Sequence, residues 1–234
     1  MKSSIQDKSK LVNSVFSRVY KKYDLMNDIM SLGIHRIWKK KLIDWMNPQV
    51  DESLIDVASG TGDVARLFSK KNNNSANISC VEPNDEMLKI GKVNLEKFKN
   101  IKWHKATGEK LPFKNNTYNF YTISYGIRNV SDINLSLKEA FRVLKPGGRF
   151  MCLEFSKIDN EIINFFYEQY SKVIPVFGKY IVGSSEPYNY LTKSIKEFYT
   201  QNQLVDLIKK NGFSNVEYRN LSNGISAIHS GWKI

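Results

Sequence analysis

Two glycines and a carboxylate mark the part of this sequence whose residue types could hold a ligand. Gly60 and Gly62 follow an apolar run, and Glu82 follows a second apolar run, twenty positions after Gly62. Glycines let a backbone approach a ligand closely, and a carboxylate at that place accepts hydrogen bonds from the hydroxyls of a ribose. The pattern predicts a nucleoside-bearing cofactor, and NAD and S-adenosylmethionine both fit it. The alternatives are a plain turn and a helix-start acid at Glu82.

The segments around these residues alternate between strands and helices from residue 51 onward. Apolar runs predict strands at 53–58, 77–81, 101–106, 117–124 and 149–155. Helices are expected at 63–71, after 82–85 and at 135–144, with a turn at 145–148. This alternation is typical of a parallel sheet with right-handed crossovers. Ligands of such sheets bind beyond the carboxyl ends of the strands, which is where Gly60 and Glu82 are expected.

The two ends of the chain depart from this alternation. Apolar residues at helical spacing predict an N-terminal helical cap over residues 1–50, and an aromatic-rich stretch with Pro and Gly predicts a helical insertion or lid at about 157–199. After a helix at 200–210, expected strands at 215–221 and 225–232 flank Ser222-Asn223-Gly224, a hairpin sequence. We therefore expect a cap over 1–50, a ligand-binding domain over 51–234 and an antiparallel last strand.

Three further segments narrow the choice of cofactor. Residues 106–113 follow the third expected strand, residues 122–126 end the fourth, and residues 144–149 precede the fifth. Together with the terminal hairpin, they resemble class I S-adenosylmethionine-dependent methyltransferases. The resemblance implies an α/β, Rossmann-like sheet of seven strands in the order 3-2-1-4-5-7-6, with strand 7 antiparallel. An NAD(P)-linked oxidoreductase, suggested by Gly60, Gly62, Ala65 and Glu82, leaves the hairpin unexplained.

Longer signatures resemble one family within that class. They lie at residues 23–39, 126–130, 142–149, 153–156 and 187–195, and they are similar to the ubiquinone/menaquinone biosynthesis C-methyltransferases (UbiE/MenG). The similarity runs from about residue 10 to the end of the chain. It implies methyl transfer from S-adenosyl-L-methionine to a ring carbon of a polyprenylated quinol precursor, with S-adenosyl-L-homocysteine as product. A methyltransferase acting on another small acceptor is the closer alternative.

The resemblance also implies a set of cofactor-binding residues. Carried over by position, with the remaining residues of the glycine turn, they are Asp56, Gly60, Thr61, Gly62, Glu82, Thr107, Gly108 and Ser124. Three positions depart from the family pattern: Ser59 replaces a common Gly, Glu82 a common Asp, and Thr107-Gly108 a commoner amide or acid. The adenine loop at Thr107-Gly108 is therefore the least secure transfer.

Methylation of a ring carbon requires the acceptor to become, or approach, a phenolate, so the site needs a base or water relay and an anion stabiliser. The first catalytic candidates are Arg128, to stabilise phenolate charge and orient a water, and Asn129, to hold a quinol oxygen. The alternative is that Arg128 pairs with an acid and Asn129 caps the next helix. Tyr125, Tyr188 and Tyr190 are expected at the quinone ring, or else in core packing.

Other polar residues have more open interpretations. His35 is a base or a packed residue at a helix terminus, and Glu154 is a base or a partner of Arg149 or Arg128. The three histidines, His35, His104 and His229, have no metal-ligand spacing with one another or with cysteine, so no metal is expected. Cys80 and Cys152 fall in expected strands, which predicts buried reduced thiols.

Composition limits where the protein acts. An apolar content of 41% rules out wholesale disorder, no run approaches the roughly 18–20 apolar residues of a membrane span, and residues 1–10 lack the apolar core of a signal peptide. The net charge is +12, and residues 1–45 carry ten basic and four acidic residues, half of that excess. We expect a cytoplasmic protein, peripheral on the inner face of the membrane through anionic lipid, and no nucleic-acid partner.

Apolar side chains of the insertion are expected either to shield the isoprenoid tail of the substrate or to pack as a plain helical cap. They are Phe165, Phe166, Ile174, Val176, Phe177, Ile181 and Val182. The choice between a benzoquinol and a naphthoquinol acceptor, the tail length, the general base, and assembly into a homodimer or a quinone-biosynthesis complex all stay open.

Overall fold

The computed structural model of the chain describes residues 12, 28, 31, 33–158, 161, 165, 167, 169, 170 and 186–234. Seven strands form one sheet in the order β3-β2-β1-β4-β5-β7-β6. They are β1 (Leu54–Val57), β2 (Ile78–Val81), β3 (Ile101–His104), β4 (Tyr118–Ser124), β5 (Leu144–Phe155), β6 (Ser214–Leu221) and β7 (Ser226–Trp232). Strands β1 to β5 are parallel and β7 is antiparallel to both neighbours. The predicted strand order and the antiparallel last strand are confirmed.

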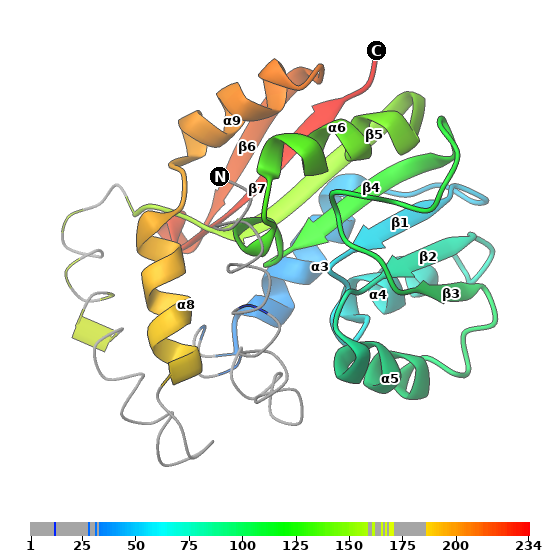
Figure 1. Ribbon diagram of the computed structural model, residues 1–234, viewed down its shortest axis with the longest axis horizontal. Helices are drawn as coiled ribbons and strands as arrows, with labels where there is room; N and C mark the ends of the chain where they lie inside the picture. The colour runs from blue at the N-terminus through cyan, green and yellow to red at the C-terminus, as the bar shows by residue number, and fades with distance from the viewer. Residues whose placement is uncertain are drawn as a thin grey trace.

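Helices cover both faces of this sheet (Figure 1). They are α3 (His35–Met46), α4 (Asp63–Lys71), α5 (Asp85–Asn94), α6 (Ile133–Val143), α8 (Glu186–Glu197) and α9 (Gln201–Lys210), with 3-10 turns η2 (Ile127–Asn129) and η3 (Ser222–Gly224). Successive strand residues point to opposite faces, so Leu54 joins one buried cluster and Ile55 the other. The first cluster includes α3, α4 and α8, and the second includes α6 and α9.

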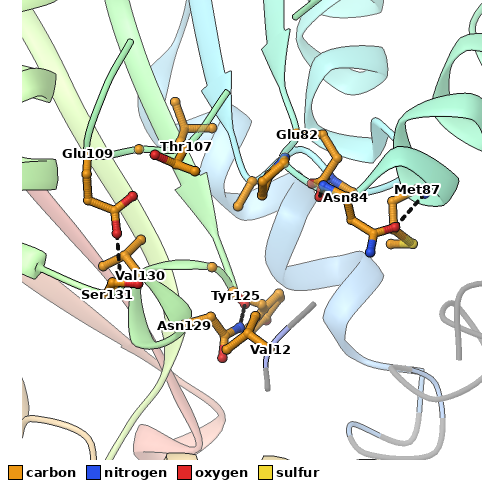
Figure 2. Close-up of a pocket in the computed structure, with 16 residues that line it drawn as sticks. Val12, Glu82, Asn84, Met87, Thr107, Glu109, Tyr125, Asn129, Val130 and Ser131 are labelled. Carbon is orange, nitrogen blue, oxygen red and sulfur yellow. Dashed lines mark hydrogen bonds between the residues drawn. The ribbon is translucent and has the colours of Figure 1, made fainter. Parts of the chain in front are cut away.

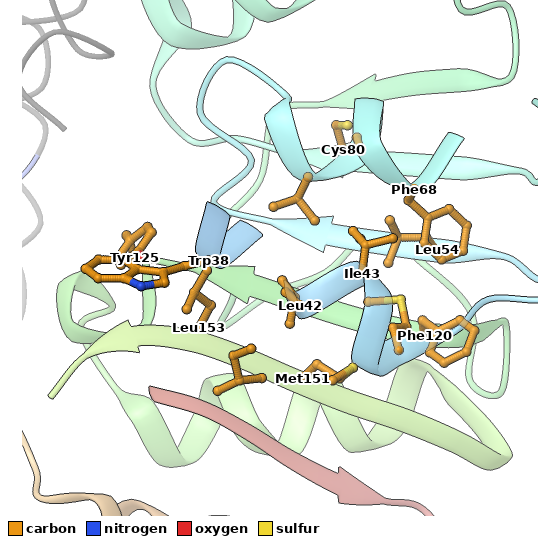
Figure 3. Close-up of a cluster of buried hydrophobic side chains, with 14 of the residues drawn as sticks. Trp38, Leu42, Ile43, Leu54, Phe68, Cys80, Phe120, Tyr125, Met151 and Leu153 are labelled. Atoms are coloured by element: carbon orange, nitrogen blue, oxygen red, sulfur yellow. The ribbon is translucent and has the colours of Figure 1, made fainter. Parts of the chain in front are cut away.

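Helix α3 is anchored across one face of the sheet. Its Trp38, Leu42 and Ile43 are buried against strand residues that include Leu54 and Met151 (Figure 3). The indole Nε1 of Trp38 also donates a hydrogen bond to Ser222 Oγ at 3.1 Å. This packing gives the residues of α3 fixed positions beside the end of β1, because buried side chains interdigitate with few alternatives.

Helix boundaries follow from capping groups that can be read in the sequence. The Asn84 side chain accepts from the backbone N–H groups of Glu86 and Met87 at the start of α5. Thr200 and Gln203 form a reciprocal capping box at the start of α9. Both helices therefore begin within a residue or two of their expected starts.

One boundary differs from the prediction. Strand β5 begins at Leu144, whereas a turn was expected over 145–148 with the strand starting at residue 149. The pairing with β4 shifts register between Tyr118 and Phe120, and Gly147 has φ 77° while its N–H donates to Lys233 O at 2.7 Å. The glycines thus form an irregularity inside a longer strand, because β4 pairs with β5 residues on both sides of them.

Much of the expected cap and insertion lies outside the described residues. Helix α3 belongs to the expected cap, and α8 to the expected insertion; the division at residue 50 stays a prediction. Phe166, Ile174, Val176, Phe177, Ile181 and Val182 lie outside the described residues, whereas Phe165 is described and exposed. Within the described ranges, no helix has the length and apolar character needed to cross a bilayer.

Candidate functional site

A cavity of about 780 Å³, open in part to solvent, lies where β1, β2 and β4 end (Figure 2). Four predicted cofactor residues line it: Gly60, Glu82, Thr107 and Gly108. The segment after β4 supplies another part of the wall through Tyr125 and Asn129, and Val12 adds a contribution from the N-terminal segment.

Glu82 joins the glycine turn to the start of α5. Its Oε2 accepts from the Gly60 N–H and its Oε1 from the Asn84 N–H, each at 2.9 Å. Burial raises the pKa of Glu82 to about 7, although these two N–H groups oppose the rise. Each carboxylate oxygen has a second lone pair, so Glu82 can still accept hydrogen bonds from a ribose in the cavity.

A second cavity, of about 320 Å³, shares Ala58 and Tyr125 with the first. Asp56, Thr61 and Ser124, all predicted cofactor residues, line it. Asp56 Oδ1 accepts from Thr122 Oγ1 at 2.7 Å. Asp56 Oδ2 and Ser124 Oγ are buried and have no hydrogen-bond partner in the part of the chain that the structure describes. Buried polar atoms are usually paired, so these two indicate a place for a polar ligand.

Two charged residues that the sequence analysis did not select complete this second cavity. Lys39 and Asp63 line it, and Lys39 Nζ donates to Asp63 Oδ2 at 2.9 Å. Helical spacing could have identified Lys39, because it lies four residues after His35 and three before Leu42, on the buried face of α3. A lysine on an apolar helix face needs a polar or charged partner for its ammonium group, since burying a charge without a partner is costly.

Gly62 has a different position from the one predicted. It lines neither cavity and stands at the N-cap of α4 with φ 89°. A Cβ on Gly62 would lie 2.5 Å from Leu95 Cδ1 and 3.1 Å from Trp103 Cζ2. These contacts give Gly62 a structural role in bringing the turn close to β3 and α5, whatever the ligand.

We expect Gly62→Ala to lower the free energy of unfolding by about 2–4 kcal/mol, since backbone strain at positive φ adds to overpacking against Leu95 and Trp103. Gly147→Ala is the matched control, because Gly147 also has positive φ (77°) but a Cβ there meets nothing within 4 Å. Urea denaturation of both variants measures the difference. An equal loss in the two would show that packing around Gly62 has no effect.

Arg128 and Glu154 form a buried ion pair between η2 and β5. Arg128 Nη1 also donates to Tyr125 O at 3.0 Å, and the guanidinium lies over the Phe155 ring, 5.6 Å from its centroid. The alternative interpretation of Arg128 was a pair with an acid, and Glu154 is that acid. Neither residue lines the two cavities, and the catalytic role of Arg128 stays a prediction.

Asn129 lines the main cavity and does not cap the following helix. The cap of α6 is Asp132, whose side chain accepts from the Leu135 N–H. Asn129 Oδ1 instead accepts from the Tyr190 hydroxyl at 3.0 Å, and Nδ2 donates to Tyr125 O at 3.4 Å. The alternative of a helix cap at Asn129 is therefore wrong, and its side chain lies where an acceptor could meet it.

The three predicted tyrosines have three different positions. Tyr125 lines both cavities with an unusual φ of 55°, and its hydroxyl is 3.5 Å from Ser226 Oγ. Tyr190 lines neither cavity, but its hydroxyl donates to Asn129 Oδ1, and Asn129 lines the main cavity. Tyr188 is fully buried in the first hydrophobic cluster and lines neither cavity. For Tyr188, core packing is the interpretation that the structure supports.

The remaining polar candidates have structural partners. His35 Nε2 lies 2.9 Å from Asp28 Oδ1, and burial lowers its pKa. Arg149 and Arg128 were the two expected partners of Glu154. Arg149 donates to Ser230 Oγ and Trp45 O, and Arg128 is the arginine that pairs with Glu154. Among the described residues, no group of His, Cys, Asp and Glu could hold a metal ion. Cys80 and Cys152 are buried and unpaired, as predicted.

Comparisons with known proteins agree with this geometry. A sequence model described as the ubiE/COQ5 methyltransferase family matches residues 3–233. A Rickettsia bellii protein named ubiquinone/menaquinone biosynthesis C-methyltransferase UbiE is 48% identical over 240 residues, covering 100% of this chain and 96% of that protein. The Rickettsia prowazekii protein of the same name is 49% identical over 231 residues, with coverages of 96% and 93%.

The fold is shared with more distant proteins. A Thermotoga maritima structure described as a SAM-dependent methyltransferase, possible histamine N-methyltransferase, superposes with a TM-score of 0.67 at 21% identity. The superposition covers 95% of this chain and 100% of that one. At this identity the likeness concerns the fold alone.

Proposed function

Because this chain belongs to the ubiE/COQ5 methyltransferase family, we propose that it transfers a methyl group from S-adenosylmethionine to a ring carbon of a polyprenylated quinol. The product is an intermediate of ubiquinone biosynthesis, menaquinone biosynthesis or both, as the names of its relatives indicate. The observation that carries the proposal is the pair of neighbouring cavities at the strand ends, lined by seven of the eight predicted cofactor residues.

The residues of the two cavities fit the chemistry of S-adenosylmethionine. Glu82 offers a carboxylate to the ribose hydroxyls, with Thr107 and Gly108 beside the adenine. Asp56 Oδ2 and Ser124 Oγ, both without partners among the described residues, offer acceptors to the amino acid end. When bound, the cofactor supplies a methyl group attached to a sulfonium. The leaving group is the neutral thioether of S-adenosylhomocysteine, so its departure needs no acid.

Activation of the acceptor is the step left to the protein. A ring carbon becomes a strong nucleophile when an adjacent ring hydroxyl loses its proton, and a nearby positive charge favours that loss. Burial raises the pKa of Tyr190; among the charges that act on this hydroxyl, Arg128 has the largest effect and lowers the pKa, whereas Glu154 and Glu197 each raise it by less. A quinol hydroxyl held at Asn129, where the Tyr190 hydroxyl binds, would feel the same field. We assign Asn129 to acceptor binding and Arg128 to stabilising the phenolate.

Complementation tests the proposed function. Expression of this chain in bacterial strains blocked in quinone C-methylation should restore the methylated ubiquinone, menaquinone or both, as seen by mass spectrometry of lipid extracts. Accumulation of the demethylated precursors in a strain that contains folded protein would contradict the proposal and favour another small acceptor.

The acceptor carries an isoprenoid tail, so we also propose that the protein docks on anionic membrane surfaces. Helix α3 exposes Lys40 and Lys41, and each lysine near such a surface contributes roughly 1 kcal/mol. We expect Lys40→Ala/Lys41→Ala to weaken binding to phosphatidylglycerol vesicles by roughly tenfold or more. The control is Lys209→Ala/Lys210→Ala, which removes two exposed lysines from α9 on the opposite face of the sheet (Figure 1). Equal effects of the two variants in co-sedimentation would contradict docking through α3.

A further inference from the structure

We infer that Lys39 binds the carboxylate of the amino acid end of S-adenosylmethionine and so makes helix α3 part of the cofactor site. The inference rests on the proposed function and names a cofactor residue beyond the strand-end loops. Among the described residues that line the two cavities, Lys39 has the single basic side chain.

Lys39 is buried but retains donors. Its side chain is 9% exposed, and its ammonium has three N–H donors. Asp63 Oδ2 is the one acceptor it contacts in the described part of the chain. The other oxygen of Asp63, Oδ1, accepts from Arg66 Nη2 at 2.9 Å. Since Arg66 also balances the charge of Asp63, Lys39 has donors and charge left for a further anion.

The opposite charge stands in the same cavity. Asp56 is 1% exposed, and its Oδ2 lacks a partner among the described residues. A cavity that presents an unpartnered carboxylate oxygen and an ammonium with spare donors suits a ligand bearing both charges. The amino acid end of S-adenosylmethionine is such a zwitterion: its ammonium would meet Asp56, and its carboxylate would meet Lys39. Ala58 and Tyr125 line both cavities, so the second cavity lies next to the one we assign to the adenosine.

A purely structural role makes a different prediction. If Lys39 served only to hold α3 to α4 through Asp63, its removal would affect all cofactor analogues alike. If it binds the carboxylate, only ligands that contain a carboxylate should be affected. S-adenosylhomocysteine and its decarboxylated analogue, which keeps the ammonium, the thioether and the adenosine, separate these cases.

The experiment is titration calorimetry of both ligands with the unsubstituted protein and with Lys39→Met, Lys39→Arg and Lys209→Met. Lys209 is an exposed lysine on α9 that lines neither cavity, so Lys209→Met is a matched loss of charge. We expect Lys39→Met to weaken S-adenosylhomocysteine binding about 10- to 100-fold, the range of a hydrogen bond between charged groups. Its affinity for the decarboxylated analogue should be unchanged, Lys39→Arg should recover part of the loss, and Lys209→Met should have no effect.

Equal losses for the two ligands, or no loss for either, would overturn the inference. The unsubstituted protein gives a test that does not depend on the folding of any variant: it must bind S-adenosylhomocysteine at least about tenfold more tightly than the decarboxylated analogue. Similar affinities for the two would refute a role for Lys39 and leave the proposed function intact. Failure to bind either ligand would contradict the proposed function itself.

Discussion

Replacing Arg128 with lysine is expected to lower kcat by roughly 100-fold while the affinity for S-adenosylhomocysteine stays unchanged. The guanidinium of Arg128 contacts Glu154, Tyr125 O and the Phe155 ring together. A lysine ammonium is a compact point charge on a different stem and cannot reproduce these contacts. The positive charge would move, and the Tyr125–Asn129 turn would lose the hydrogen bond from Arg128 Nη1 to Tyr125 O.

Two further variants separate catalysis from folding. Arg142→Lys alters another arginine with several partners, which include Glu139 and Phe113 O, outside the two cavities. It should lower the melting temperature without lowering kcat. Arg128→Gln/Glu154→Gln removes both charges, so no buried charge is left unpaired; it should fold and still turn over slowly. Normal turnover in Arg128→Lys would show that Arg128 does not act on the acceptor.

Asp56→Asn is expected to weaken S-adenosylhomocysteine binding roughly 100-fold. It is also expected to increase the free energy of unfolding of the variant, relative to that of the parent protein, as the pH rises. The loss of affinity is expected because a neutral amide would replace the carboxylate that we propose binds the cofactor ammonium. The change in stability has a separate cause, which is the burial of the same carboxyl group.

The sign of the pH effect follows from the pKa of Asp56. Burial raises it from 3.8 to about 7, so the folded protein holds this proton more tightly than the unfolded chain. Ionised Asp56 therefore costs stability, and the cost grows from about pH 4 to pH 7. Asparagine does not ionise, and any cost of its buried amide is independent of pH. The free energy of unfolding of the variant minus that of the parent should grow by roughly 2–4 kcal/mol over this range.

Urea denaturation at a series of pH values measures this difference, and calorimetry measures the affinity. Asp206→Asn, at an exposed carboxylate on α9, should leave both quantities unchanged. A stability difference that is flat with pH would contradict the buried, ionisable state of Asp56. Unchanged affinity for S-adenosylhomocysteine would contradict its contact with the cofactor.

The sequence predicted the parts of this protein that depend on local patterns. Alternating apolar runs gave the parallel strands, and Ser222-Asn223-Gly224 marked the hairpin that turns β7 antiparallel. Glu82 was predicted at a ribose from its spacing after the glycine turn, and it does line the main cavity. These features are visible in a sequence because each is set by residues close together in the chain.

Features set by contacts between distant residues were not predictable in the same way. Gly62 was expected at the cofactor, but its neighbours Leu95 and Trp103 come from elements far along the chain. Tyr188 faces the core because of how α8 packs, which no single-sequence pattern specifies. Lys39 joins the second cavity only because Trp38 and Leu42 fix α3 across the sheet. Tertiary packing decided all three: helical spacing places Lys39 on the buried face of α3, but it does not show which cavity that face meets.

The most direct test of the proposed function is methyl transfer from S-(trideuteromethyl)adenosylmethionine by the purified protein. The acceptors are a demethylated polyprenyl benzoquinol and a demethylated polyprenyl naphthoquinol, each kept reduced in detergent. We predict that a trideuteromethyl group appears on a ring carbon of at least one acceptor, located by NMR and mass spectrometry, and that Arg128→Lys greatly slows its appearance. Absence of transfer to both reduced acceptors by folded, cofactor-binding protein, or transfer to oxygen alone, would contradict the proposed function.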